Sequence, residues 1–184
     1  MRAALDLLEE RDYEQVQMRD IAARADVALG TLYRYFSSKE HLYAGVMLVW
    51  ISSFRRGLGR GDLPVEPADR LRESLRRAID AFSRRPQFLR LEVLLMSSTD
   101  AQAQELFVEF SDQHIAAYRQ LLSGLADGDI DQIVWVTSAV LGNMLHSYAL
   151  GRVSLEQVQE VVLGTVDLIF SPPPRAAAGG LGPP

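Results

Sequence analysis

Helical signals dominate this chain, and strand signals are nearly absent. Apolar residues recur three or four positions apart, as in Leu71, Leu75 and Ile79, which is the spacing of one face of an α-helix. The one Asp-Gly pair, at 127–128, lies between helical patterns and not between two alternating apolar runs, as a β-hairpin would require. The pattern therefore predicts an all-α protein of about nine helices.

Several residues mark where these helices begin and end. Ser37, Thr99, Asp129 and Ser154 are each followed three positions later by Glu or Gln, the spacing of a capping box at a helix start. Residues 57–67 are rich in Gly and Pro and predict a loop. Prolines at 172–174 forbid continuation of the last helix, and the small residues after them predict a disordered tail over 172–184.

Charge is distributed unevenly along the 184 residues. Basic and acidic residues balance over residues 1–56, so the net charge of −5 comes from residues 57–184. Within residues 15–39, four basic residues face only two acidic ones. A small, locally basic segment on an acidic body is consistent with nucleic-acid contact at the N-terminal end.

Other features exclude several classes of protein. The chain has no cysteine, which removes disulfides, thiolate metal sites and cysteine nucleophiles. The three histidines, His41, His114 and His146, lack metal-ligand spacing, and no Gly-x-Ser-x-Gly elbow is present. We expect no metal, no cofactor and no enzymatic activity. The absence of a membrane-length apolar run or signal peptide predicts a cytoplasmic protein without membrane contact.

The segment from Met18 to Phe36 is the most informative. It reads as two short helices around a tight turn, with small residues Ala22 and Ala25 allowing close approach. The outer face of the second helix carries hydroxyl, aromatic and guanidinium groups. Such groups suit base edges, thymine methyls and phosphates. This is the pattern of a helix-turn-helix, whose second helix enters the DNA major groove.

Residues 17–42, and above all Gly30-Thr31-Leu32-Tyr33-Arg34-Tyr35-Phe36-Ser37-Ser38-Lys39-Glu40-His41-Leu42, resemble the tetracycline-repressor (TetR) family of bacterial regulators. The resemblance extends over about residues 4–50. It implies an all-helical homodimer with a helix-turn-helix domain at 1–45, a ligand-binding and dimerisation domain at 46–171, and the tail at 172–184. The sequences of residues 16–20 and 28–36 are similar to those of family members that control steroid or lipid catabolism in actinobacteria.

The resemblance also implies which residues contact double-stranded operator DNA. Lys39, at the start of the next helix, is expected on a phosphate, whereas Arg19 could contact a phosphate or pair with Asp20 or Asp26. The alternative for all of them is a solvated helix face. The expected DNA-binding residues are Gln17, Arg19, Leu29, Gly30, Thr31, Tyr33, Arg34, Tyr35 and Lys39.

Two features differ from the family pattern. Members usually have a basic arm ahead of the segment that matches Ala4, so the start at Met1 leaves open whether the N-terminus is complete. Gln17 stands where the family usually has Ser or Thr, and Gln is a poor N-cap.

Large apolar and aromatic residues of the body are candidates to line a ligand pocket, with His114 or a tyrosine orienting one polar group. The alternative is an ordinary bundle core, because apolar stripes look the same in both cases. The ligand-binding candidates are Met47, Trp50, Phe54, Phe82, Phe88, Leu91, Phe107, Phe110, His114, Tyr118, Met144 and Tyr148.

The last two predicted helices carry more apolar stripes than one small body can bury, and the family usually builds its dimer interface from them. Small residues among the stripes would let backbones come close. The predicted interface residues are Val134, Ser138, Leu141, Gly142, Leu145, Leu155, Val158, Val162 and Ile169.

These observations predict a ligand-responsive DNA-binding transcriptional regulator. We expect a repressor, released from a palindromic operator by a small apolar effector. Two alternatives stay open: a helical interaction module, and a regulator that responds to a protein partner rather than a small molecule. The sequence does not identify the ligand, the operator, the regulated genes or the sign of regulation.

Overall fold

The computed structural model describes the backbone of residues 1–58 and 64–171 and the side chains of residues 1–52 and 64–171. Over these ranges the chain is all-α, as predicted, and forms no strand. The predicted tail and the side chain of Phe54 lie outside the described residues. The elements are α1 (Arg2–Glu10), the 3-10 helix η1 (Tyr13–Gln15), α2 (Met18–Arg24), α3 (Leu29–Tyr35), α4 (Lys39–Leu58), α5 (Pro67–Ser83), α6 (Pro86–Met96), α7 (Ala101–Leu121), α8 (Asp127–Ala149) and α9 (Leu155–Phe170).

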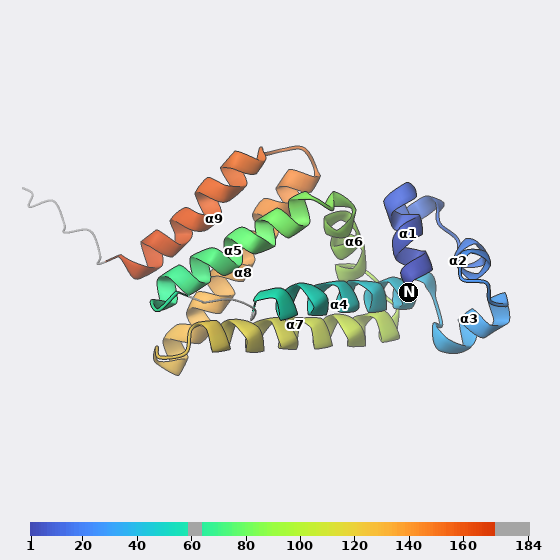
Figure 1. The fold of residues 1–184 in the computed structure, drawn as a ribbon, viewed down its shortest axis with the longest axis horizontal. Helices are drawn as coiled ribbons and strands as arrows, with labels where there is room; N and C mark the ends of the chain where they lie inside the picture. The colour runs from blue at the N-terminus through green and yellow to red at the C-terminus, as the bar shows by residue number, and fades with distance from the viewer. Residues whose placement is uncertain (59–63, 172–184) are drawn as a thin grey trace, which may run out of the picture.

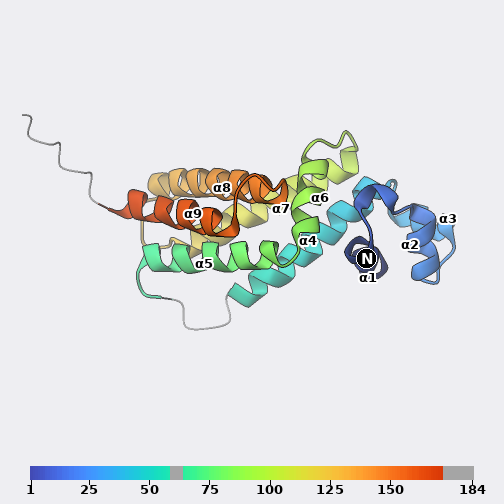
Figure 2. The same ribbon diagram turned by 90° about the horizontal axis from the view of Figure 1, so that it is seen from above.

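Helices α1, α2 and α3 form a small group at one end of the molecule, and α5, α8 and α9 lie toward the other end (Figures 1 and 2). The long helix α4 runs from the small group into the body, where it packs along α7. Helix α6 stands between α1 and the rest of the body. Exposed ion pairs of Arg85 with Glu9 and of Arg90 with Asp12 connect it to the small group.

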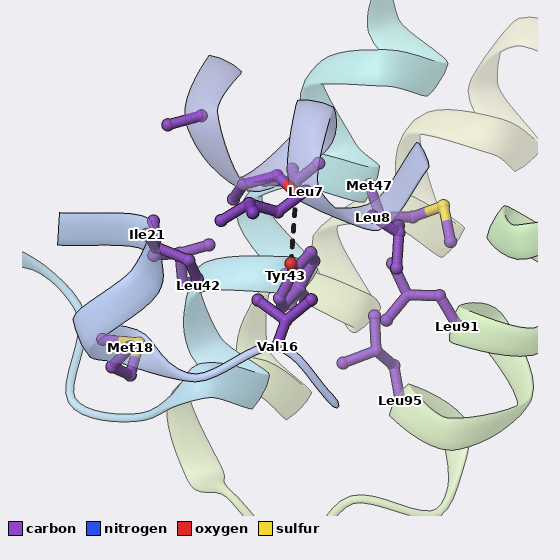
Figure 3. Close-up of a cluster of buried hydrophobic side chains, with 14 of the residues drawn as sticks. Leu7, Leu8, Val16, Met18, Ile21, Leu42, Tyr43, Met47, Leu91 and Leu95 are labelled. Carbon is purple, nitrogen blue, oxygen red and sulfur yellow. Dashed lines mark hydrogen bonds between the residues drawn. The ribbon is translucent and has the colours of Figure 1, made fainter. Parts of the chain in front are cut away.

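A first core joins the N-terminal helices to α4 and α6 (Figure 3). Leu7 of α1, Leu42 of α4 and Leu91 of α6 are buried in it. Tyr43 is fully buried, and its hydroxyl donates to the carbonyl oxygen of Ala4 at 3.1 Å. Each buried Leu contributes on the order of 1.5–3 kcal/mol. The small N-terminal group is therefore packed onto α4 rather than tethered to it.

A second core lies between α5, α8 and α9. Leu71, Leu75 and Ile79 of α5 are fully buried there, as the sequence spacing predicted. Val158 and Val162 of α9 pack on the same cluster. Helix α9 packs on both α5 and α8, so one apolar stripe of α9 holds both neighbouring helices in place.

The helix caps were predicted with mixed success. The capping box of Ser154 is confirmed, with Ser154 Oγ accepting the backbone N–H of Gln157 at 3.2 Å. In place of Ser37 and Thr99, the next residues accept the capping hydrogen bonds: Ser38 at α4 and Asp100 at α7. The prediction for Asp129 is wrong, because α8 already begins at Asp127 without a side-chain cap. Runs of polar residues offer several possible caps, and spacing alone does not choose between them.

Candidate DNA-binding surface and ligand cavity

The turn between α2 and α3 is closed by two backbone hydrogen bonds. The N–H of Asp26 donates to the carbonyl of Ala23 at 3.2 Å, and that of Val27 to the carbonyl of Ala22 at 3.0 Å. This pairing is a Schellman motif, and it places Asp26 in the left-handed region at φ 53°. Asp tolerates this region better than most residues do. The turn fixes the direction in which α3 leaves α2.

Helix α3 buries one residue and exposes most of the others. Leu32 faces the core, whereas Tyr33 is 50% and Tyr35 65% exposed. Leu29, Gly30 and Arg34 are also exposed, and Thr31 is half-buried. The guanidinium of Arg34 lies 5.4 Å from the centre of the Tyr35 ring. In both ribbon views α3 lies at the free end of the molecule (Figures 1 and 2), so no other part of the described chain covers this face.

The start of α2 lies beside this face and is also exposed. The backbone N–H of Gln17 donates to the Asp20 carboxylate at 3.1 Å. Asp20 thus contributes to the cap at the start of α2, where Gln17 was expected to be a poor N-cap. Arg19 Nε lies 3.9 Å from Asp20 Oδ1, and its side chain is 72% exposed. Such a pair is weak and leaves the guanidinium accessible.

Two further basic residues are held by the protein itself. Arg24 makes a two-bond fork to Glu10 at 2.9 and 2.8 Å. Lys39 Nζ donates to the carbonyls of Tyr13 and Val16 at 2.9 and 3.1 Å and lies over the Tyr13 ring. Burial lowers the pKa of Lys39. Two of its three N–H groups thus fasten the η1 segment to α4, and one is left for another acceptor.

The body contains a cavity of about 460 Å³ bounded by helices α4 to α8. Its lining is mostly apolar, with aromatic side chains from α4, α5 and α7. Six of the predicted ligand-binding residues line it: Trp50, Phe82, Phe107, Phe110, His114 and Tyr118.

The other described candidates do not line this cavity. Met47, Phe88 and Leu91 are buried in the first core, where the Phe88 ring stacks on Trp50 with centroids 4.3 Å apart. Met144 and Tyr148 pack against the second core. These five residues therefore lie apart from the cavity lining. An apolar stripe shows which side of a helix is buried, but not whether that side meets other side chains or open space.

Polar groups enter the cavity at a few points. His114 Nε2 lies 3.3 Å from Ser138 Oγ. Tyr118 is buried beside Ser74, and burial raises the pKa of Tyr118 to about 12. His146 Nε2 lies 3.4 Å from Glu92 Oε2. The sequence analysis did not single out Glu92, although a carboxylate four residues after Phe88, on the apolar side of α6, was a visible signal.

Comparison with known proteins shows which family the N-terminal part of the chain resembles. The model of the bacterial regulatory proteins of the tetR family matches residues 1–46. Residues 1–46 are thus similar to the DNA-binding segment of the TetR family. A curated relative, the transcriptional repressor KstR of Rhodococcus jostii, is 39% identical over 103 residues. That match covers 55% of this chain and 47% of KstR, so the chain spans about half the length of this relative.

Solved structures extend the likeness to the whole fold. A TetR transcriptional regulator from Rhodococcus sp. RHA1 is 27% identical with a TM-score of 0.73, over 92% of both chains. The Thermus thermophilus repressor FadR, solved in complex with lauroyl-CoA, is 19% identical with the same TM-score over 97% of both chains. The names of these proteins are those of transcriptional regulators.

Two features are absent from the part of the chain that the structure describes. No helix there is long and apolar enough to span a membrane. No group of three or more His, Asp or Glu side chains gathers there in a way that could hold a metal ion.

Several of the predicted dimer residues pack inside the chain. Val134, Leu141, Leu145, Val158 and Val162 are all buried in the second core or beside the cavity. In this arrangement their side chains contact other parts of the same chain. The exposed apolar residues of α8 and α9 are instead Trp135, Val136, Val161 and Leu168. Ser138, Gly142, Leu155 and Ile169 remain partly exposed.

Proposed function

We propose that this chain is a TetR-family DNA-binding transcriptional repressor that a small apolar effector releases from a palindromic operator. The exposed, mixed polar and aromatic face of α3 is the observation that carries the DNA-binding part. The likeness to KstR, which is named as a transcriptional repressor, supports the same conclusion. Residues 1–45 would form the DNA-binding domain and residues 46–171 the ligand-binding and dimerisation domain.

On the DNA, α3 would lie in the major groove. Thr31, Tyr33 and Tyr35 would face base edges, and Arg34 would contact bases or phosphates. Arg19 and the backbone near Gln17 would meet the flanking phosphates, with Lys39 offering its remaining N–H to another. A homodimer would place two copies of α3 on half-sites about one helical turn apart, or a multiple of that spacing.

The apolar cavity carries the effector part of the proposal. A volume of about 460 Å³ lies in the range that holds small-molecule ligands. Two structural neighbours, the FadR proteins of Thermus thermophilus and Bacillus subtilis, were solved with lauroyl-CoA and stearoyl-CoA, which both carry long apolar chains. An effector in this cavity would favour a conformation in which the two copies of α3 no longer match the operator, and the operator affinity would fall.

Measurement of binding to DNA from the region upstream of the protein's own gene tests the first part. Fluorescence anisotropy should show tighter binding to that DNA than to a random duplex of equal length. Tyr33→Ala should reduce this preference by tenfold or more, because a specific base contact contributes about 1–3 kcal/mol. Val65→Ala, an exposed change on the body, is the matched control and should leave the preference unchanged.

Other outcomes identify the alternatives. Equal, weak binding to both duplexes would contradict a regulator and favour a helical interaction module. Specific operator binding that no apolar compound weakens would favour a regulator that responds to a protein partner.

A further inference from the structure

We infer that Glu92 and His146 form a polar subsite of the cavity that recognises a hydroxyl group on an otherwise apolar, uncharged ligand. The inference rests on the proposed ligand-binding function and specifies the chemistry of the ligand. Glu92 comes from α6 and His146 from α8, and both line the cavity. They therefore approach the ligand space from two different helices.

The two side chains face each other without satisfying each other. His146 Nε2 lies 3.4 Å from Glu92 Oε2, and the side chains are only 23% and 18% exposed. Nε2 itself has very little accessible surface and no hydrogen-bond partner among the described residues. A buried polar atom left unpaired costs on the order of 1–3 kcal/mol. A ligand group that pairs with both residues would recover this cost.

The hydrogen-bonding groups of Glu92 and His146 limit which chemical group of a ligand can pair with both residues. The Glu92 carboxylate only accepts hydrogen bonds, and a protonated Nε2 of His146 donates one. A hydroxyl can serve both, because its O–H donates to Glu92 while its oxygen accepts from His146. A ketone offers Glu92 no donor, and an ammonium offers His146 no acceptor.

The negative charge of Glu92 disfavours an anionic ligand group in this subsite. Glu92 is the one Asp, Glu, Lys or Arg among the described residues that line the cavity. A ligand carboxylate beside Glu92 would place two like charges together in an apolar surrounding with no Lys or Arg to compensate. Like charges in such sites are strongly disfavoured. The subsite should therefore reject a carboxylate that has the same apolar chain as an accepted alcohol.

An alternative role for the pair is purely structural, as a tie between α6 and α8. The two roles differ in what they predict for ligands. A structural tie affects the stability of the protein but does not discriminate between ligands that share an apolar chain. Discrimination between head groups, measured on folded protein, is therefore the decisive quantity.

The test uses the full chain without DNA and three ten-carbon probes: 1-decanol, decanoic acid and decylamine. Dissociation constants are measured at pH 7.5 by isothermal titration calorimetry. The wild-type protein should bind 1-decanol at least about tenfold more tightly than decanoic acid, whereas decylamine, whose ammonium can pair with Glu92 alone, separates the effect of charge from that of hydrogen bonding. Glu92→Leu and His146→Leu should each remove most of this preference. Phe107→Ala, a lining change away from the pair, should weaken binding of all three probes alike.

A conservative variant keeps the test valid if the Leu variants fold poorly. Glu92→Gln retains a hydrogen-bond acceptor and removes the charge. It should keep 1-decanol binding within about threefold while improving that of decanoic acid, and circular dichroism melting confirms that it is folded.

Equal affinity for 1-decanol and decanoic acid, tighter binding of decanoic acid, or no binding of 1-decanol would each overturn the subsite. If the predicted preference holds but 1-decanol does not release the operator, the subsite stands and the proposed effector role fails.

Discussion

Asp26 holds a backbone conformation that glycine adopts more easily. Its φ of 53° lies in the left-handed region, which costs a residue with a Cβ about 1 kcal/mol relative to glycine. Asp26→Gly should therefore raise the free energy of unfolding, by up to about 1 kcal/mol, because relief of strain exceeds the entropy that glycine loses on folding. Urea unfolding followed by circular dichroism measures the change.

Asp26→Ala is the matched control for this prediction. It removes the carboxylate but keeps the Cβ and the strain, so its free energy of unfolding should not increase. If Asp26→Ala and Asp26→Gly stabilise equally, the carboxylate and not the backbone is the source of the cost.

Lys39 combines a structural contact with a possible DNA contact, and the two can be separated. Lys39→Ala removes the hydrogen bonds to Tyr13 and Val16, so the free energy of unfolding should fall by about 1–3 kcal/mol. If the remaining N–H binds a phosphate, operator and random DNA should both bind more weakly, and the salt slope should fall by about one unit. A destabilised variant with an unchanged salt slope would restrict Lys39 to its structural role.

Helix α4 is the element that connects the N-terminal helices to the cavity. Trp50 on α4 lines the cavity, stacks on Phe88 of α6 and meets Phe82 of α5 edge-on at 5.0 Å between ring centres. A ligand that displaces this indole would therefore move three helices at once. This makes Trp50 a better candidate for coupling ligand to DNA than the buried residues before it on α4.

Trp50→Phe should weaken ligand-induced release of DNA several-fold while leaving operator affinity without ligand within about twofold. The phenyl ring keeps most of the packing, whereas Trp50→Ala would cost about 3–5 kcal/mol of stability and confuse the result. Release is followed by anisotropy of labelled operator during titration with 1-decanol. Val49→Ala, an exposed change one residue away, should leave release unchanged, and a Val49→Ala effect equal to that of Trp50→Phe would contradict the assignment.

The helices could be predicted from the sequence because their signals are local. Much of the candidate site could not be predicted in this way. The apolar spacing of α5 and the Ser154 box at α9 each depend on a few neighbouring residues, and both are confirmed. The cavity depends on how helices distant in sequence pack together. Met47 and Trp50 share one predicted stripe, yet Met47 enters a core and Trp50 faces the cavity. The Glu92–His146 pair joins residues 54 positions apart, a contact that periodicity cannot reveal.

In the whole molecule, α3 lies at one end and α8 and α9 lie toward the other (Figures 1 and 2). Exposed Leu168 and Val161 lie on one side of α9, seven residues apart and therefore two turns along the helix. We propose that the dimer contact lies on these two helices, where these exposed residues would form it. In a two-fold dimer built there, a small change in the packing of α8 and α9 would alter the spacing of the two distant α3 helices.

Adjacent residues of α9 offer a sharp test of this interface. Val161 is 44% exposed and Val162 is 1% exposed. Val161→Asp should yield folded monomers, because a two-fold interface would bury the new charge twice without a partner. Val162→Asp should instead unfold the chain, because it places the charge in the second core. Sedimentation velocity reports the oligomeric state, and circular dichroism reports the folding of each variant. Monomeric Val161→Asp should also bind a two-half-site operator no more tightly than a single half-site. A Val161→Asp, Leu168→Asp double variant that remains dimeric would exclude this face of α9 and place the interface elsewhere on the molecule.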